Sequence, residues 1–568
     1  MVKKKKPAER AEPSVMSRGL RRFLYGTACT TGAGILIVEI LGAKMLSPYL
    51  GTSHFVWTAQ IAVTLVALSA GYYAGGWLVD RSQNLNRLYY AILGAAVYLC
   101  ATVPMVKPLC LKLIGLPLEG AALLASAFLF LVPLALLAMT GPFLVRMLTE
   151  SVESVGTSMG RLTAISTLGS VAGAVLIGYV LIPNLPNSIT MLITAGVLIA
   201  LAAVYLIVWG RGESGATAIV VALLIGFALG LSGLRGQFGN KMKITGYPND
   251  WSVLHRANSN YGELLVIEYR QGGYVERRYL NDKLLQNTYD PVAKKSRSLF
   301  TGALRWLAHA YTPGIERVLC IGMGAGIVPM QFAADGIKTD VVEINGAVVP
   351  LAGEHFDFDQ KKVNLTIGDG RQFLNQSQQQ YDAIILDAFL GDSSPSHLMT
   401  KEAFAEMRRH LTPTGVLVIN SFGESSKERQ FFSASLDQTL RDAFGRDRVR
   451  VHASGRGNVF FVAAAGELTV HRPPQPDLEA AARLAAAADD DATMAEWKNW
   501  HDAAGAKGPF FSEHFQVQDE MSLMWKKQRQ FNPQQGQILT DDFNPVEFYD
   551  RRNRDENRRH LIRSVHPQ

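Results

Sequence analysis

Cysteine and charge are both scarce in this chain, and each shortage narrows what the protein can be. Only four of the 568 residues are cysteine and none forms a Cys-x-x-Cys pair, so we expect neither a disulfide framework nor a zinc site. Charged residues make up 18% of the chain and apolar residues 48%. Because soluble domains carry about 25% charged residues, the composition indicates that part of the chain lies outside water.

The apolar residues are crowded into the first part of the chain, up to about Leu234. Single hydrophobic cores stop growing at about 250–300 residues, so a chain of this length contains at least two units. Apolar stretches of membrane-spanning length occur at 24–46, 55–79, 88–106, 120–145, 162–183, 187–209 and 216–234. We therefore expect a multi-pass α-helical membrane bundle of about seven spans at 24–236.

A basic tail, residues 1–23, precedes the first span and contributes to the net charge of +7. Cytoplasmic loops favour Lys and Arg, so we interpret the tail as a topology signal and expect no nucleic-acid partner. The first apolar run is too long for a cleaved signal peptide. These features predict a multi-pass protein of a bacterial-type inner (cell) membrane, with the lipid bilayer as a partner.

The loop charges bear on the side of the membrane that the rest of the chain occupies. If the N-terminus is inside, loop arginines such as Arg87, Arg161 and Arg211 are inside too. Seven spans would then place the C-terminal part outside the cytoplasm. An eighth crossing, from Pro108 to Pro117 or from a split of 120–145, would keep it inside, and the sequence leaves this choice open.

Two features inside the bundle invite interpretation. Glu39 lies within the first span, where an ionisable group is expensive and faces either a functional cavity or a structural hydrogen bond; we weigh the two equally. Gly71, Gly75 and Gly76 are small enough to let helices approach closely, so we expect helix packing there.

From about Trp251 the hydrophobic period changes to that of strands. A hairpin is predicted at 263–269 and 275–280. Strand-like runs then alternate with helical ones, at 317–321, 339–343, 363–367, 382–387 and 415–420. Such alternation predicts an α/β doubly wound domain with a mostly parallel sheet at 250–465. For the remainder, 466–568, the sequence predicts a helical, charged C-terminal extension.

The strongest local signal is Arg317-Val-Leu-Cys-Ile-Gly322-Met-Gly324-Ala-Gly326, a strand that enters a glycine-rich turn before a helix. Glycines there let the backbone approach a ligand, and the helix N-terminus favours polar groups. Glu343 ends the next strand about twenty residues on, where an acid accepts hydrogen bonds from ribose hydroxyls. The pattern predicts an adenosine-type ligand.

Two more acids follow later strands. Asp369 and Gly370 close the third strand, where the carboxylate could bind an adenine amino group, and Asp387 ends the fourth. Because doubly wound sheets bind ligands at this edge, we favour ligand binding over a fold that has kept only its shape.

Residues 255–465 resemble the spermidine synthase (polyamine aminopropyltransferase) family, which has the class I methyltransferase fold. The matching pieces are Asn260-Tyr261-Gly262, Asn281-Asp282-Lys283-Leu-Leu-Gln286 for the family's Leu-Asp-Gly-x-x-Gln, the glycine turn, Val342-Glu343-Ile344, Gly368-Asp369-Gly370, and Asp387 with Asp392. With its helices included, the chain is similar to the membrane-fused branch of that family.

The resemblance implies polyamine biosynthesis: transfer of an aminopropyl group from decarboxylated S-adenosylmethionine to a small-molecule amine such as putrescine, without a metal. Asp387 or Asp392 would then be the base or amine anchor. The implied cosubstrate-binding residues are Gly322, Gly324, Gly326, Glu343, Asp369, Gly370, Asp282 and Gln286.

Three departures from the family affect this expectation. The acid that pairs with the donor's aminopropyl ammonium is replaced by Ala325, and an unpaired buried ammonium costs several kcal/mol. Ser298-Leu299-Phe300-Thr301 replaces a Tyr followed by His or Gln, and Asp387 and Asp392 are spaced differently from the family's two acids.

Two alternatives therefore stay open. One is a methyltransferase that uses S-adenosylmethionine; the other is a non-catalytic transporter or sensor whose soluble domain binds a nucleoside or a polyamine. His397 is either a second base or a bystander, and Asp541 and Asp542 either cover the site or form a plain acidic turn. A homo-oligomer is also left open.

Overall fold

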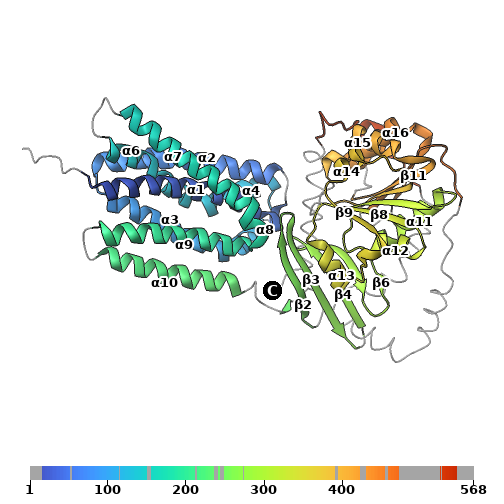
Figure 1. The fold of residues 1–568 in the computed structure, drawn as a ribbon, viewed down its shortest axis with the longest axis horizontal. Helices are drawn as coiled ribbons and strands as arrows, with labels where there is room; N and C mark the ends of the chain where they lie inside the picture. Colours follow the sequence, from blue (N-terminus) through green and yellow to red (C-terminus); the bar gives the residue numbers. More distant parts are fainter. Residues whose placement is uncertain are drawn as a thin grey trace, which may run out of the picture.

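The computed structural model describes a helical bundle joined to an α/β domain (Figure 1). The described residues are 16–51, 54–113, 115–149, 155–210, 214–235, 241–242, 249–272, 274–389, 395–422, 430–453, 458–471, 525 and 528–545. The extension predicted at 466–568 falls mostly outside these ranges.

Within the described residues, seven helical paths are long and apolar enough to cross a membrane. Five paths are single helices: α1 (Arg18–Leu50), α2 (His54–Arg81), α3 (Leu85–Leu113), α9 (Asn187–Val208) and α10 (Ser214–Arg235). The fourth path in chain order consists of α4 (Leu118–Ser126), η1 (Ala127–Leu131), α5 (Val132–Ala138) and α6 (Thr140–Leu148). The fifth consists of α7 (Val155–Leu176), η3 (Ile177–Leu181) and α8 (Ile182–Asn184). Each path contains one predicted apolar stretch.

Neither region that we considered for an eighth crossing supplies one. Pro108 lies inside α3. The path Leu118–Leu148 has 31 residues, and at a rise of about 1.5 Å per residue it is about 46 Å long, which suffices for a single crossing. The short joints between successive paths make neighbouring helices antiparallel, so an odd number of paths separates the start of α1 from the α/β domain.

Small residues bring the helices of the bundle close together, as the sequence indicates. The Cα of Gly71 lies against the backbone of Ala135, and that of Gly75 lies against Met139, with no room for a Cβ at either position. Gly76 has no such neighbour. Glu39, in contrast, is only partly buried.

The first part of the α/β domain is an antiparallel sheet of six strands in chain order, where the sequence suggested a single hairpin. The strands are β1 (Lys241–Met242), β2 (Trp251–Ser259), β3 (Gly262–Gln271), β4 (Tyr274–Asn281), β5 (Leu284–Asp290) and β6 (Lys295–Ser296). The two predicted strands are β3 and β4; the outer strands are too polar to show a clear period of two.

A second sheet has seven strands in the order β12-β13-β11-β10-β7-β8-β9. The strands are β7 (Arg317–Ile321), β8 (Lys338–Glu343), β9 (Asn364–Ile367), β10 (Tyr381–Leu386), β11 (Leu411–Phe422), β12 (Val449–Ala453) and β13 (Asn458–Ala464). The five strands predicted from the sequence form the parallel part. The antiparallel pair β12 and β13 was not predicted.

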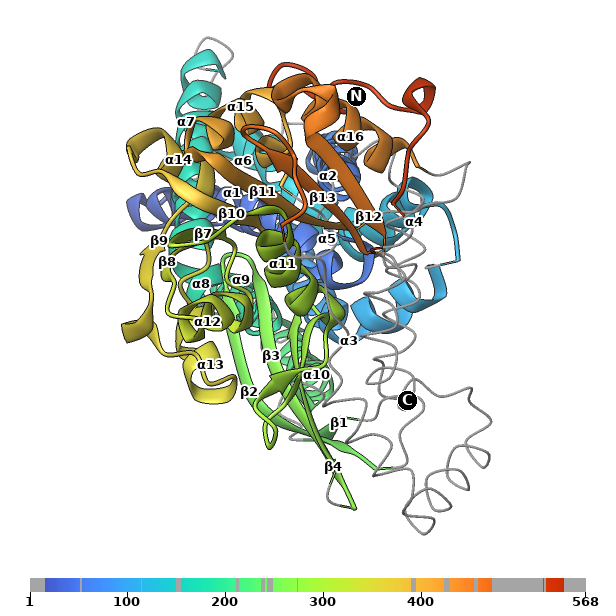
Figure 2. The same ribbon diagram turned by 90° about the vertical axis from the view of Figure 1, so that its right-hand side faces the viewer.

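Alternate residues of β7, β8, β10 and β11 are buried on opposite faces, and helices cover both (Figure 2). On β7, Val318 and Cys320 face a core that includes the first sheet, whereas Leu319 and Ile321 face the other core. The first face is covered by α11 (Leu299–Tyr311), α12 (Ile327–Ala334) and α13 (Val348–His355), and the second by α14 (Gly370–Gln376), α15 (Lys401–Arg409) and α16 (Phe431–Phe444). This is the doubly wound α/β architecture that the alternation predicts, and it agrees with the class I methyltransferase-like fold that the resemblance implies.

The end of α1 contacts the first sheet directly. The ammonium of Lys44 donates a hydrogen bond to the carbonyl oxygen of Asn260 at 3.0 Å, and Ser47 Oγ donates to Asp282 Oδ2 at 3.4 Å. Because α1 ends at the α/β domain, its basic start lies at the opposite end of the bundle.

Lys283 forms the centre of this junction. It lies in the turn between β4 and β5 with φ at +64°, a left-handed conformation that costs energy in residues other than glycine. Its ammonium donates a hydrogen bond to the hydroxyl of Tyr49 at 2.6 Å and lies 4.2 Å from the ring centre. Burial lowers the pKa of Lys283, but Tyr49, Glu263 and Asp282 raise it by more, so the pKa lies above its usual value.

We predict that three variants distinguish the stability contribution of the Tyr49–Lys283 contact from the cost of the backbone strain at Lys283. Tyr49→Phe should lower the stability of the chain by about 1–3 kcal/mol, because the buried ammonium loses an acceptor. Lys283→Ala should destabilise the chain more than Lys283→Gly, by about 1 kcal/mol, because only glycine accepts the positive φ without strain. Thermal unfolding of the full chain in detergent measures both differences. Equal stabilities for the Ala and Gly variants would contradict the strain argument.

Candidate functional site

A cavity of about 400 Å³ lies where the parallel strands end, at the edge that faces the first sheet. This volume is within the range of pockets that bind small ligands, about 300–1,000 Å³. The strand ends contribute Gly322 and Gly324 after β7, Glu343 from β8, Asp369 after β9, Asp387 after β10 and Asn420 from β11. The predicted convergence of acids at one sheet edge is therefore present.

Glu343 holds the glycine turn in place. Its Oε2 accepts a hydrogen bond from the backbone N–H of Met323, and its Oε1 accepts one from the N–H of Asn345, both at 2.8 Å. Burial raises the pKa of the carboxyl above its usual value, although these backbone hydrogen bonds oppose the shift. The backbone N–H groups of Gly324 and Ile344 also act on this carboxylate, so a ligand in the cavity would share its oxygens with the backbone.

Gly322 is required because two loops meet at its Cα. It has φ at +91°, and a Cβ there would overlap the carbonyl oxygen of Asp387. The backbone N–H of Asp387 in turn donates to the carbonyl of Ile321 at 3.0 Å. The missing side chain therefore lets the ends of β7 and β10 lie against each other below the cavity.

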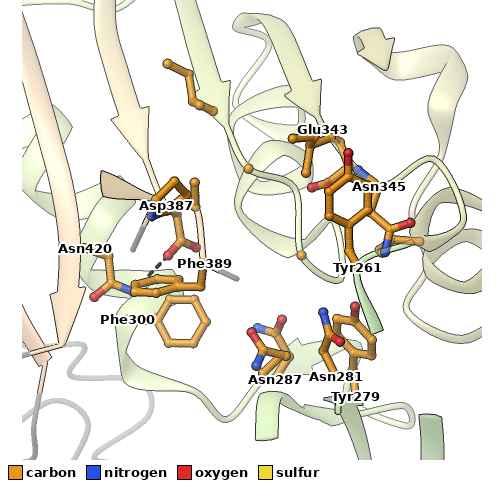
Figure 3. Close-up of a pocket in the computed structure, with 18 of the residues that line it drawn as sticks. Tyr261, Tyr279, Asn281, Asn287, Phe300, Glu343, Asn345, Asp387, Phe389 and Asn420 are labelled. Carbon is orange, nitrogen blue, oxygen red and sulfur yellow. Dashed lines mark hydrogen bonds between the residues drawn. The ribbon is translucent and has the colours of Figure 1, made fainter. Parts of the chain in front are cut away.

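Asp387 is linked by hydrogen bonds to the side-chain amides of two asparagines. Asn458 Nδ2 donates to Asn420 Oδ1 at 2.9 Å, and Asn420 Nδ2 donates to Asp387 Oδ1 at 2.9 Å (Figure 3). Burial raises the pKa of Asp387 to about 6, opposed by the hydrogen bond from Asn420 and aided by Glu343. A carboxyl group whose pKa is near neutrality is suited to accept a proton.

Asp369 has a structural task in addition to its place in the cavity. Its Oδ1 caps α14 by accepting from the N–H groups of Arg371 and Gln372, and its Oδ2 lies 2.8 Å from His397 Nε2. These contacts outweigh the effect of burial and lower the pKa of Asp369. Arg371 forms a two-pronged ion pair with Asp541, so the late segment is tied to this rim of the cavity.

Aromatic rings form the remaining walls. Figure 3 places Phe300 and Phe389 beside Asp387, and Tyr261 beside Glu343 and Asn345. Phe300 stands in the segment that departs from the family pattern. The side of the cavity near Asp387 is therefore less polar than that pattern implies.

Most of the predicted site residues line the cavity. These are Gly322, Gly324, Glu343, Asp369, Gly370, Gln286 and Asp387. Gly326 is not among the lining residues: it begins α12, and a Cβ there would overlap the ring of Phe358. Asp282 also lies outside the lining, because its carboxylate binds the backbone N–H of Glu263 and Ser47 at the bundle. Asp392 falls outside the described residues.

The glycine turn carries no acid at position 325. Ala325 is buried, and its N–H donates to Asn287 Oδ1 at 3.3 Å. Asn287, on β5, lines the cavity. A neutral amide therefore lies next to the position at which the family has a carboxylate.

Four asparagines of the cavity escaped the sequence analysis: Asn287, Asn345, Asn420 and Asn458. A signal existed for two of them. Asn345 follows the end of β8 by two residues, and Asn420 is the last residue of the predicted strand 415–420. Asn287 and Asn458 lie on strands whose pairing partners the sequence does not reveal.

The family model for the spermine/spermidine synthase domain matches residues 305–452. The C-terminal part of the chain contains a spermine/spermidine synthase domain. The match covers the glycine turn, Glu343, Asp369, Asp387 and Asn420, and so includes the strand ends that form the cavity.

The proteins that are similar in sequence include aminopropyltransferases and an N-methyltransferase. The chain is 31% identical over 210 residues to a polyamine aminopropyltransferase of Vibrio vulnificus, covering 34% of this chain and 66% of that protein. It is 34% identical over 216 residues to an N-terminal histidine N-methyltransferase of Emericella nidulans, covering 34% and 38%. The chain thus spans less than two thirds of the length of these relatives. The spermidine synthase structure from Thermotoga maritima is 17% identical, with a TM-score of 0.32, and covers 50% of this chain and 94% of that one.

We predict that Asp387→Asn stabilises the fold in a pH-dependent way. The pKa of the carboxyl rises from 3.8 to about 6 on folding, so the folded state loses stability as the pH rises through this range. The loss reaches about 3 kcal/mol at pH 8, at about 1.4 kcal/mol per pKa unit. The variant should be more stable than the wild type by up to that amount at pH 8 and by little at pH 4, as measured by denaturant unfolding. An Asp542→Asn control, at an exposed position, should show no such trend, and a gain independent of pH would refute the argument.

Proposed function

We propose that the spermine/spermidine synthase domain transfers an aminopropyl group from decarboxylated S-adenosylmethionine to a small-molecule amine. The observation that carries the proposal is the presence of two carboxylates, the buried Glu343 and the half-buried Asp387, in one cavity on either side of the glycine turn. Relatives named polyamine aminopropyltransferase support the same activity.

The donor's adenosine would occupy the Glu343 side of the cavity. The carboxylate oxygens of Glu343 would accept hydrogen bonds from the ribose hydroxyls, with Gly322, Gly324 and Gly370 allowing the backbone to come close. Asp369 already binds His397, so an adenine amino group would share this carboxylate with the histidine or displace it. Gln286 would contact the donor from β5.

The amine would react on the Asp387 side. Asp387 accepts the proton of the incoming ammonium, and the freed nitrogen lone pair attacks the carbon of the aminopropyl group next to the sulfonium. The carbon–sulfur bond breaks, and its electron pair stays on sulfur, leaving a neutral thioether. Alignment of the nitrogen, carbon and sulfur supplies much of the rate. We propose that Asp392 assists as a second amine ligand.

Methyl transfer from S-adenosylmethionine is the second candidate, and Ala325 is the observation that favours it. An aminopropyl ammonium beside Ala325 and Asn287 would meet an amide instead of a carboxylate, whereas the amide N–H₂ of Asn287 could donate to the carboxylate that S-adenosylmethionine carries. The N-methyltransferase relative is consistent with this reading.

We predict that binding of the two donors to the full chain in detergent separates these candidates. Titration calorimetry should show tighter binding of decarboxylated S-adenosylmethionine, and Ala325→Asp should strengthen that binding about tenfold, or about 1.4 kcal/mol, by restoring an acid for the ammonium. Tighter binding of the carboxylated donor, weakened by Ala325→Asp, would instead support methyl transfer. Glu343→Ala should abolish binding of both, and unfolding curves will show whether that variant keeps its fold.

We further propose that the bundle spans a bilayer as a multi-pass inner-membrane anchor. With seven crossings, the basic start of α1 and the soluble domain lie on opposite sides. Arg81, Arg146 and Arg161 lie at the same end of the bundle as that start, and the positive-inside tendency places this end in the cytoplasm. The soluble domain would then lie outside, where adenosyl donors are scarce.

We predict that alkaline phosphatase fused to the C-terminus is active in a bacterial host, and that the same reporter fused after Arg81 is inactive. This outcome would place the domain outside the cytoplasm, so that the proposed transfer would depend on donor and amine molecules present on that side of the membrane. The reverse pattern would place the N-terminus outside against its charge, and would leave the domain with direct access to cytoplasmic donors.

A further inference from the structure

Three side chains able to bind a metal converge away from the cavity, where β2 meets the end of α13. His255 lies on β2, and Glu354 and His355 are the last two residues of α13. One ligand atom of each lies within 4.8 Å of those of the other two. None of the three lines the cavity, so the cluster is separate from the proposed transferase site.

His355 is the buried member of this cluster and has an unused nitrogen. Its exposed fraction is 8%, and among the described residues its Nε2 has no hydrogen-bond partner. The carboxylate Oε1 of Glu354 is 3.7 Å away, which is too long for a hydrogen bond. Burying a polar atom without a partner is unfavourable, so this nitrogen points to a ligand.

The residue is also held in a fixed position. Arg277 Nη1 donates a hydrogen bond to the carbonyl oxygen of His355 at 2.6 Å. The charge of that arginine is taken up by Glu268, whose Oε2 lies 2.9 Å from Arg277 Nε. The guanidinium therefore orients the end of α13 while its own charge is balanced by an acid.

The geometry of the three groups suits a tetrahedral ion. Zinc binds imidazole nitrogen at about 2.0–2.1 Å and carboxylate oxygen at about 2.0–2.2 Å, so two such ligands lie about 3.4 Å apart across a tetrahedral site. The separation of 3.7 Å between His355 and Glu354 is close to this value. The rings of His255 and His355 are inclined at 72° with centres 5.4 Å apart, as two imidazoles that converge on one point would be.

We propose that His255, Glu354 and His355 bind one zinc ion, with water as the fourth ligand. We expected no zinc site because the cysteines form no metal-binding motif, and the two histidines lie about one hundred residues apart in the sequence. Two imidazoles and one carboxylate form a donor set that zinc prefers.

The ion would connect the two parts of the α/β domain. On the same face of β2, four residues from His255, Ser259 Oγ accepts a hydrogen bond from Asn345 Nδ2 at 3.0 Å. Asn345 and Val348, at the other end of the α13 segment, line the cavity. Zinc would thus hold β2 and α13 together at one end, while the other end of the same two elements lies at the cavity wall.

Zinc titration of the full chain tests the proposal. The chain is purified in detergent without a polyhistidine tag, stripped with a chelator and titrated with zinc by calorimetry. We expect one equivalent to bind per chain and the melting temperature to rise with zinc, as for any ligand of the folded state. His255→Ala and Glu354→Ala should each weaken this binding at least tenfold and remove the rise. Both residues are more exposed than His355, so these variants keep the core intact.

His309→Ala is the matched control. His309 lies 3.4 Å from the carboxylate of Asp335, a histidine–acid pair without the second imidazole, so its loss should leave the zinc equivalent unchanged. The absence of a bound equivalent would overturn the proposal. So would an equivalent that survives both His255→Ala and Glu354→Ala, or one that His309→Ala removes equally.

Discussion

The carboxylate of Glu343 is the contact on which the cavity depends. It accepts hydrogen bonds from the glycine turn after β7 and from the segment after β8, so one buried acid fixes both loops. Burial raises its pKa, which shows that the charged form is held against a desolvation cost. Gly322 then allows Asp387 to approach from β10. Glu343 and Asp387 are therefore placed by one another's loops and not independently.

The helical bundle contributes to this site without reaching it. Asp282 and Lys283 bind Ser47 and Tyr49 at the end of α1, and the residues that flank them, Asn281 and Gln286, line the cavity. A lysine replaces the family's glycine at a left-handed position, and its contact with Tyr49 offsets the strain. Any tilt of α1 relative to the first sheet would therefore move one wall of the cavity, which gives the fusion of bundle and domain a physical consequence.

Features encoded within a short segment of the sequence could be predicted, whereas features that depend on contacts between distant residues could not. Strand 317–321 and the acids at strand ends were predicted because a short apolar run and a glycine turn are readable within a few residues. The contact of Asp282 with Ser47 was not predicted, because nothing in the sequence shows that its turn faces α1. Asn458 and the strands β12 and β13 were missed for a similar reason, because these strands are defined by antiparallel pairing that continues from β11. The cluster of His255 and His355 likewise appears only after folding.

The charge of the cavity constrains its ligand whichever activity it serves. Of the described lining residues, three are acids, Glu343, Asp369 and Asp387. The lining Arg297 is engaged by Asp290 at 2.6 Å, and His397 by Asp369. Inside a partly dry site such an excess of acid is strongly felt. A ligand that combines a nucleoside or polyhydroxyl part with a positive charge fits this field, as a sulfonium or an amine does. Under the proposed function, Ala325 and Asn287 would select among such cations by placing a neutral amide beside the glycine turn.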